Sequence, residues 1–257
     1  MEKSKKLDLV FLLIYPILGA IVSHLLKINA FGSVVVFFVI PSVYLTLKAP
    51  QYFKKAFLFS LLAIPFIVVV DYVAHLTGQW IIPHSMFPRV FQYITVEIIF
   101  WAVLNFYFVT IFYEYFLHHH FTKKPYSSKI KYPVAGISLL FIIFLFFYNF
   151  FPGYLHIPFF YLTFGTIFIL IPIILQFFYY PKFIFKFFIV AAYFFFVTFI
   201  YETAALQLGW WGFPGQQFIG WVSVFNVKFP IEEFVFWLLL LAMAILSYYE
   251  FFDNDEK

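Results

Sequence analysis

Cysteine is absent from this chain of 257 residues. That absence excludes disulfide bonds, a thiolate nucleophile and any metal site built on cysteine. Charge is also scarce, because 11% of the residues are charged while 65% are hydrophobic, and the mean hydropathy is +0.96. A soluble domain of this length cannot bury so much apolar surface, so lipid is predicted to be the solvent for most of the chain.

Aspartate is rare as well, and this excludes the Asp-rich magnesium-diphosphate motif that a membrane prenyltransferase needs. The four aspartates are Asp8, Asp71, Asp253 and Asp255. The sequence contains no Gly-rich phosphate loop, dinucleotide fingerprint or Ser-His-Asp arrangement, so we predict no cofactor and no metal. The consecutive histidines 118–120 lie beside Lys123 and Lys124. They would point apart on a helix, which favours a solvated interfacial tract over a metal site.

Apolar runs long enough to cross a bilayer, about 20 residues each, recur along the whole chain. They predict an all-α integral membrane protein with about eight transmembrane helices. The first run is longer than the apolar region of a signal peptide, so it is expected to be a retained span. The runs cover residues 7–26, 30–48, 54–76, 92–117, 133–151, 157–180, 183–207 and 229–252.

The basic residues predict the orientation of these spans. The formal net charge of +4 does not indicate a nucleic-acid partner, because the lysines lie in short loops between the runs. If the N-terminus is cytoplasmic, 13 of the 16 basic residues fall on that side, and only Lys27, Arg89 and Lys228 fall on the other. This bias predicts a multi-pass protein of the cell inner membrane with both termini in the cytoplasm.

Two halves of the chain resemble one another when the sequence is shifted along itself. An offset of 131 along the chain, which becomes 136 after an insertion, aligns rare charged residues, tryptophans and prolines. Four spans separate equivalent points, so both halves are predicted to cross the membrane in the same direction as four-helix repeats, residues 1–131 and 132–257. The aligned pairs are Pro41/Pro172, Pro50/Pro181, Lys55/Lys186, Asp71/Glu202, Trp80/Trp211, Glu97/Glu233, Phe100/Phe236, Trp101/Trp237 and Glu114/Glu250.

Five carboxyl groups are predicted to lie within the membrane at a common depth. Asp71 and Glu202 each follow an aligned lysine by 16 residues, or about 24 Å of helix. The other three, Glu97, Glu232 and Glu233, begin helices that descend from the same side. An acid in a transmembrane segment is by default a functional candidate, although Asp71 or Glu202 alone can also be a structural hydrogen-bonding group between helices.

Neighbouring acids are expected to have different roles. Glu232 and Glu233 are about 100° apart on a helix, so one of them can face a site while the other caps the helix or reaches the interface. Glu114 and Glu250 lie near the far ends of the helices that Glu97 and Glu233 begin, and we expect them to face headgroups and lysines at the cytoplasmic interface.

Two kinds of side chain near the acids allow both a functional and a structural interpretation. His75 lies four residues after Asp71, on the same helical face, where it can orient the carboxylate, share its proton or serve as a structural histidine. Trp80 and Trp211 lie in the outer loops, together with Trp210 and Trp221, where an aromatic belt is expected in any membrane protein.

A ring of carboxyl groups in an apolar, aromatic chamber can hold a neutral carboxylic acid beside a carboxylate. A proton donor beside a proton acceptor is what general acid–base catalysis on a lipid-soluble substrate requires. Membrane carboxylates also serve as proton relays, so a proton-coupled transporter is the main alternative. A purely structural membrane protein is a third interpretation, which a shared depth for five acids disfavours.

The acid-bearing segments resemble the small membrane-bound lycopene cyclases, which are built from two homologous halves that are separate chains in some bacteria and fused in archaea and fungi. The resemblance lies in Glu202, Gly209-Trp210-Trp211, Gly220 and the stretch 230–236 (Pro-Ile-Glu-Glu-Phe-Val-Phe), which fits the Pro-x-Glu-Glu/Asp motif of that family. A weaker echo, from Asp71 through Gly78-Gln79-Trp80 to 97–100, occupies the first half. There Ile94 and Val96 replace the proline and the first acid, so the second half is expected to carry the essential acid.

The resemblance implies a linear carotene as substrate and a redox-neutral cyclisation of its ψ-end groups to β-ionone rings. It also leaves room for a related carotenoid end-group enzyme. In this interpretation Glu232 or Glu233 donates the proton, and Asp71, Glu202 and Glu97 act as base or balance charge. The residues expected to contact the substrate are Pro230, Phe236, Trp80, Trp211 and His75. The expected partners are the carotene and membrane lipid, no nucleic acid is expected, and the sequence does not specify an oligomeric state.

Overall fold

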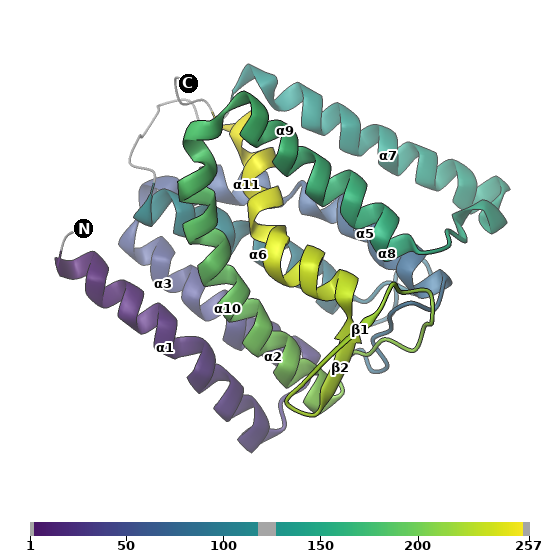
Figure 1. Cartoon of the computed structure of the whole chain (residues 1–257), viewed down its shortest axis with the longest axis horizontal. Coiled ribbons are helices and arrows are strands. Elements are labelled where there is room, and N and C mark those ends of the chain that lie inside the picture. The colour runs from purple at the N-terminus through teal and green to yellow at the C-terminus, as the bar shows by residue number, and fades with distance from the viewer. Residues whose placement is uncertain (1–2, 118–126, 254–257) are drawn as a thin grey trace.

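A computed structural model describes residues 3–117 and 127–253 (Figure 1). Seven helices in it are long and apolar enough to cross a membrane, and a bent pair makes an eighth span. The predicted class, an all-α multi-pass membrane protein, is confirmed. The His118–His120 tract, Lys123 and Lys124 lie outside the described residues.

The first half contributes four spans. Helix α1 is followed by a second span that changes from α-helix to a π-helical stretch and back. The third span is bent by 42° between α4 and α5, and a long loop leads to the fourth. In order, the elements are α1 (Lys3–Leu26), α2 (Ala30–Val34), η1 (Val35–Val39), α3 (Ile40–Lys48), η2 (Pro50–Tyr52), α4 (Phe53–Ser60), α5 (Ala63–Leu76) and α6 (Val96–Phe116).

The second half repeats this succession, with a straight third span and a β-hairpin in its long loop. Its elements are η3 (Ser128–Ile130), α7 (Lys131–Phe150), η4 (Pro152–Leu155), α8 (Phe160–Gly165), η5 (Thr166–Leu170), α9 (Ile171–Tyr179), η6 (Pro181–Phe183), α10 (Ile184–Leu208), β1 (Trp221–Val224), β2 (Val227–Pro230), η7 (Glu233–Leu240) and α11 (Leu241–Phe252).

Local backbone features recur at the sequence offset that aligns Pro41 with Pro172. The π-helical stretches η1 and η5, the helices α3 and α9, and the short turns η2 and η6 all begin at positions that this offset relates. The third span of each half ends next to a glycine with positive φ, Gly78 at 66° and Gly209 at 70°, a conformation that glycine adopts without steric cost. The repeated residues therefore specify repeated backbone geometry.

The two halves interlock. The first span of each half packs against the third span of the other, α1 against α10 and α7 against α5. As a result α1 and α7 lie at opposite edges of the bundle (Figure 1), and they are the least buried spans in the described chain. The boundary near residue 131 therefore separates two sequence repeats, but the repeats pack into one helical bundle and are not separate domains.

The hairpin β1–β2 is a feature that the all-helical expectation omitted. Trp221 pairs with Pro230 and Val224 with Val227 in antiparallel register. Phe225 and Asn226 at the turn both have positive φ, 47° and 64°, as a two-residue type I′ turn requires. The hairpin leads directly into the helix that carries Glu232 and Glu233.

Glu114 and Glu250 are buried, so the expectation that they face headgroups is wrong, whereas the expected contact with a lysine is present for Glu114. Their exposed fractions are 0% and 3%. The Lys55 ammonium lies 2.9 Å from a Glu114 oxygen and 2.5 Å from an Asp253 oxygen. Helix rise gives depth along the bundle but not position across it, and these acids occupy its centre.

Tyrosines of the two repeats cross over between these acids. Tyr249 donates a hydrogen bond to Glu114, and its counterpart Tyr113 donates one to Glu250 at 3.3 Å. Each tyrosine thus reaches the acid of the opposite half, and the pair ties the fourth spans, α6 and η7–α11, together at this end.

Gly165, in the second span of the second half, permits close contact with the ring of Phe236 in η7. A Cβ atom built on Gly165 would overlap the ring of Phe236. The first half has Val34 at this position, and its aligned Phe100 is 37% exposed instead. We expect Gly165→Ala to lower the free energy of unfolding by about 1–3 kcal/mol, the cost of overpacking a core.

Denaturation in detergent micelles, followed by tryptophan fluorescence, measures this change. Gly136→Ala is the matched control, because a Cβ atom there meets nothing within 4 Å. Equal stability of the two variants would contradict the packing argument.

Candidate active site

A cavity of about 60 Å³ lies between α2, α5 and α6 of the first half and α8, α10 and η7 of the second. We call it the acid cavity, because four carboxyl-bearing residues line it. They are Asp71, Glu97, Glu202 and Glu233. Their exposed fractions are 9% or less, so all four carboxyl-bearing side chains are buried within the bundle.

Equivalent residues of the two repeats line the acid cavity from both sides. Fourteen of its lining residues form seven pairs at the offsets of 131 and 136. The pairs are Ala30/Tyr161, Ile67/Thr198, Val70/Tyr201, Asp71/Glu202, Trp80/Trp211, Glu97/Glu233 and Trp101/Trp237. Equivalent residues that meet around one space indicate a pseudo-twofold axis that passes through it.

The loops after the third spans meet on this axis. Ile81 and Gly212, which are equivalent positions of the two repeats, exchange two backbone hydrogen bonds of 3.0 Å. The aligned indoles of Trp80 and Trp211 lie beside one another with ring centroids 5.7 Å apart. Both tryptophans line the acid cavity, which agrees with the functional interpretation of these residues.

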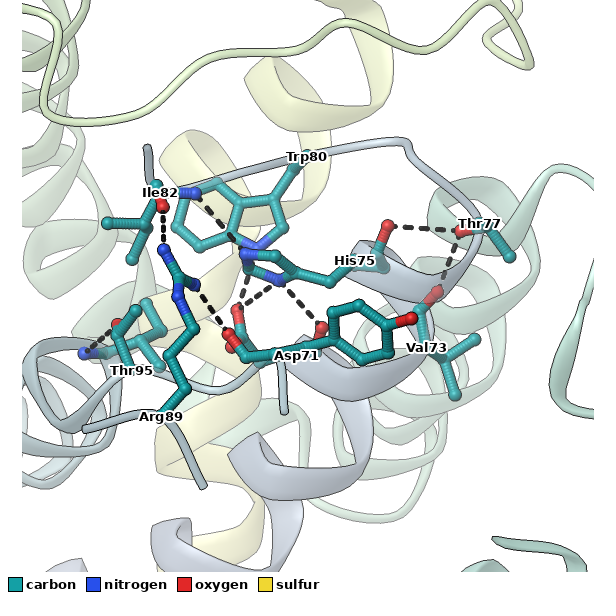
Figure 2. Close-up of polar contacts among 11 residues, drawn as sticks. Asp71, Val73, His75, Thr77, Trp80, Ile82, Arg89 and Thr95 are labelled. Atoms are coloured by element: carbon teal, nitrogen blue, oxygen red, sulfur yellow. Dashed lines mark hydrogen bonds and ion pairs between the residues drawn. The ribbon is translucent and has the colours of Figure 1, made fainter. Parts of the chain in front are cut away.

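The Asp71 carboxylate accepts one indole N–H and lies beside the ring of His75 (Figure 2). The indole Nε1 of Trp80 donates to the carboxylate at 2.7 Å. Nδ1 of His75 hydrogen-bonds to the backbone carbonyl of Asp71 at 3.0 Å and lies 3.3 Å from the same carboxylate oxygen. Nε2 of His75 accepts the backbone N–H of Ile82 at 3.3 Å, which leaves the ring proton on Nδ1. His75 thus donates to the Asp71 backbone with its ring edge beside the carboxylate, and Asp71 Oδ2 has no hydrogen-bond partner in the described chain.

Glu202 repeats this arrangement with one donor. Trp211 Nε1 lies 3.0 Å and 3.1 Å from its two oxygens, and the tryptophan follows the acid by nine residues, as Trp80 follows Asp71. Hydrogen bonds donated to an ionised carboxylate stabilise its charge. Each third-span acid thus has an indole N–H donor that offsets part of the cost of burying a carboxylate charge.

Two acids of the fourth spans accept hydrogen bonds from the preceding loops rather than from tryptophans. Glu97 accepts from the hydroxyl of Ser85 at 2.8 Å and from the backbone N–H of Met86 at 2.7 Å. Glu232 likewise accepts the backbone N–H of Ile219 from the preceding loop, at 2.7 Å. Glu232 is 1% exposed and is not among the residues that line the acid cavity.

Glu233 is the exception among the acids of the cavity. No hydrogen-bond donor or cation contacts its carboxyl group in the described chain, yet it lines the acid cavity. The second residue of the fourth-span helix is Glu97 in the first half and Glu232 in the second, an offset of 135. The π-helical stretch η7 then adds one residue to the second half. Glu97 both accepts a loop N–H and lines the acid cavity, whereas in the second half Glu232 accepts the loop N–H and Glu233 lines the cavity.

Two predicted contact residues lie elsewhere. Pro230 pairs with Trp221 in the hairpin, and Phe236 packs on Gly165 in the core. Neither is among the residues that line the acid cavity, so these two assignments have no support from its geometry.

Sequence reasoning overlooked four aromatic residues of the acid cavity, Tyr161, Tyr201, Trp101 and Trp237. The last two aligned in the repeat and thus carried a signal. Their indole Nε1 atoms are buried and have no hydrogen-bond partner in the described chain. Tyr161 aligns with an alanine, so no pattern in the sequence singled it out.

Fold and cavity together define a multi-pass membrane protein with buried carboxyl groups gathered on a pseudo-twofold axis. No protein-family model, no curated protein and no solved structure matches the chain. The family resemblance of its sequence motif therefore stays a prediction.

Proposed function

We propose that the protein cyclises the ψ-end groups of lycopene, or of a closely related linear carotene, to β-ionone rings by acid–base catalysis. The observation that carries this proposal is the contrast within the acid cavity. One carboxyl group, on Glu233, has no donor or cation in the described chain, while the three others accept hydrogen bonds from N–H and O–H groups.

Glu233 is the proton donor in this proposal. A carboxyl group in an apolar cavity without donors or cations is more stable neutral than ionised, because ionisation there is not compensated by solvation. Its proton passes to the terminal double bond of the carotene and leaves a tertiary carbocation. The neighbouring double bond then attacks this cation and closes the six-membered ring.

Asp71 is the proton acceptor. Both oxygens of Glu202 share the Trp211 donor, and both oxygens of Glu97 are occupied by loop donors. Oδ2 of Asp71 is free to accept in the described chain. It removes the proton next to the ring cation, the ring double bond forms, and return of that proton to Glu233 completes a redox-neutral cycle.

Aromatic side chains support the cationic intermediates. The rings of Trp80, Trp101, Trp211, Trp237 and Tyr161 line the acid cavity, and an aromatic face attracts a cation within about 6 Å. The burial of the acids excludes bulk water, which would otherwise quench the carbocation. In the proposed orientation, the termini are cytoplasmic and the membrane is the cell inner membrane.

Pigment extraction tests the reaction directly. We expect lycopene-accumulating cells that express the native chain to produce cyclic carotenes, identified by chromatography and absorption spectra. Unchanged lycopene at normal expression of the membrane protein would contradict the proposal.

One observation favours the alternative of a proton-coupled transporter. The span that carries Asp71 is bent by 42° near Leu61 and Leu62, and bent or broken helices are common around transport sites. The equivalent helix α10 is unbroken. Proton uptake by reconstituted vesicles, coupled to a solute and without ring formation, would favour the transporter over the cyclase.

A further inference from the structure

We propose that a second, apolar cavity beneath α7 binds the polyene chain of the substrate while its end group occupies the acid cavity. This inference rests on the proposed function, because it assigns a place to the part of the substrate that does not react. We call the second space the tail cavity.

The acid cavity cannot hold a whole carotene. Its volume of about 60 Å³ accommodates only a few water-sized spheres, given that one water needs about 10–15 Å³ on this measure. The tail cavity measures about 280 Å³ on the same scale. A long hydrocarbon with one end at Glu233 thus needs a further site, and the larger space is available for it.

The walls of the tail cavity suit a hydrocarbon. Among the described residues its lining contains no charged residue and is formed by aliphatic and aromatic side chains, a proline and a glycine, with two tyrosines as the only polar side chains. The walls come from α4, α5, α6, α7, η5 and α11. A polyene that fills this space stabilises the complex through van der Waals contacts with walls that otherwise face an unfilled space.

An aromatic series links the two cavities. Trp237 lines the acid cavity and stacks on Phe164, with ring centroids 6.2 Å apart and planes within 1°. Phe164 stacks in turn on Phe168 at 4.6 Å, and Phe168 lines the tail cavity. Phe66 lines it too and contacts Phe164 at 5.2 Å. These aromatic rings thus form part of the wall between the two cavities, and a conjugated chain can stack against them.

The tail cavity lies next to the lipid-facing edge of the bundle. Helix α7, at that edge in Figure 1, provides Tyr132, Pro133, Gly136, Ile137 and Leu140 to the lining. Only 6% of its span is buried, so a single weakly packed helix separates the cavity from the bilayer. A membrane-dissolved polyene has a short path into it.

Gly136 allows the cavity to be filled without damage to the fold. A Cβ atom at this position meets no atom within 4 Å, so a larger side chain enters open space. Because Gly136 lines the tail cavity, we expect the side chain of Gly136→Leu to occupy part of the space where we place the polyene. Gly153→Leu is the matched control, because Gly153 also has open space around its Cβ but does not line the tail cavity.

The experiment measures polyene retained by protein purified in detergent from lycopene-accumulating cells. All proteins carry Glu233→Gln to prevent turnover, and pigment per protein is read from visible absorbance. We expect Gly136→Leu to reduce retained polyene about tenfold or more, the effect of at least about 1.4 kcal/mol of steric overlap, and Gly153→Leu to retain as much as the parent. Leu140→Trp, one turn further along α7, gives a second filled variant should Gly136→Leu not fold.

Equal retention by the filled and control variants would overturn the tail cavity, and so would a parent that retains no polyene. Loss of phospholipid rather than polyene, measured by mass spectrometry, would overturn it too and assign the space to a lipid acyl chain. Cyclisation by the native background tests the proposed function separately. Polyene retention without ring formation would support the tail cavity and contradict the proposed cyclisation. Ring formation that is unaffected by Gly136→Leu would support the cyclisation and contradict the tail cavity.

Discussion

Replacement of Glu233 by glutamine is expected to lower the rate of the proposed ring formation by about 100- to 10 000-fold, the usual contribution of a positioned general acid. Glutamine keeps the shape of the side chain but has no acidic proton. Because no hydrogen bond or ion pair holds the Glu233 carboxyl group in the described chain, the change removes the proton without breaking a structural contact. Timed pigment analysis of isolated membranes gives the rate.

Glu232→Gln is the matched control, one residue earlier in the same helix. Its amide oxygen can still accept the Ile219 N–H that the carboxylate accepts at 2.7 Å, and its side chain does not line the acid cavity. We expect this variant to keep most of the native rate. A larger loss at Glu232 than at Glu233 would reverse the assignment of the proton donor.

The sequence was sufficient to predict the spans and the pairing of acids. The lengths of the apolar runs are enough to locate the helices. The repeat is visible because charged residues are rare in this chain, so a constant offset that aligns Asp71 with Glu202 is informative. Identical offsets in η1/η5 and η2/η6 follow from the same residues. Asp71, Glu97, Glu202 and Glu233 accordingly meet at one cavity.

The choice between two adjacent glutamates could not be made from the sequence. Neighbouring residues of an α-helix differ by about 100°, but the stretch from Glu233 to Leu240 winds as a π-helix, which adds a residue and shifts the phase of everything after it. Such insertions are frequently found at functional sites. No residue pattern around 232–240 specified this one.

Lateral position was equally inaccessible from the sequence. A count of helical residues places Glu114 and Glu250 near the end of the bundle, and this leaves open whether they face lipid or protein. Tyr113 and Tyr249, which decide the matter, are ordinary aromatic residues of apolar helices until the two halves are seen to pack together.

Lys55→Met is expected to lower the free energy of unfolding by about 3–5 kcal/mol, the cost of removing one partner from a buried ion pair. The Lys55 side chain is 8% exposed and lies between Glu114 and Asp253, whose side chains are 0% and 2% exposed. Methionine has a similar length and no charge, so the variant isolates the loss of the ammonium group. Unfolding in mixed micelles, followed by tryptophan fluorescence, measures the difference.

Lys186→Met is the control that the repeat provides, since Lys186 is the counterpart of Lys55 at the offset of 131. Lys186 is half-buried and has no ion pair with the described residues, so its loss should cost no more than about 1 kcal/mol, as for an exposed charge. The asymmetry follows from chemistry: one lysine compensates two buried carboxylates, and the other compensates none in the described chain. Equal destabilisation by the two variants would mean that the Lys55 cluster contributes no more than a surface charge.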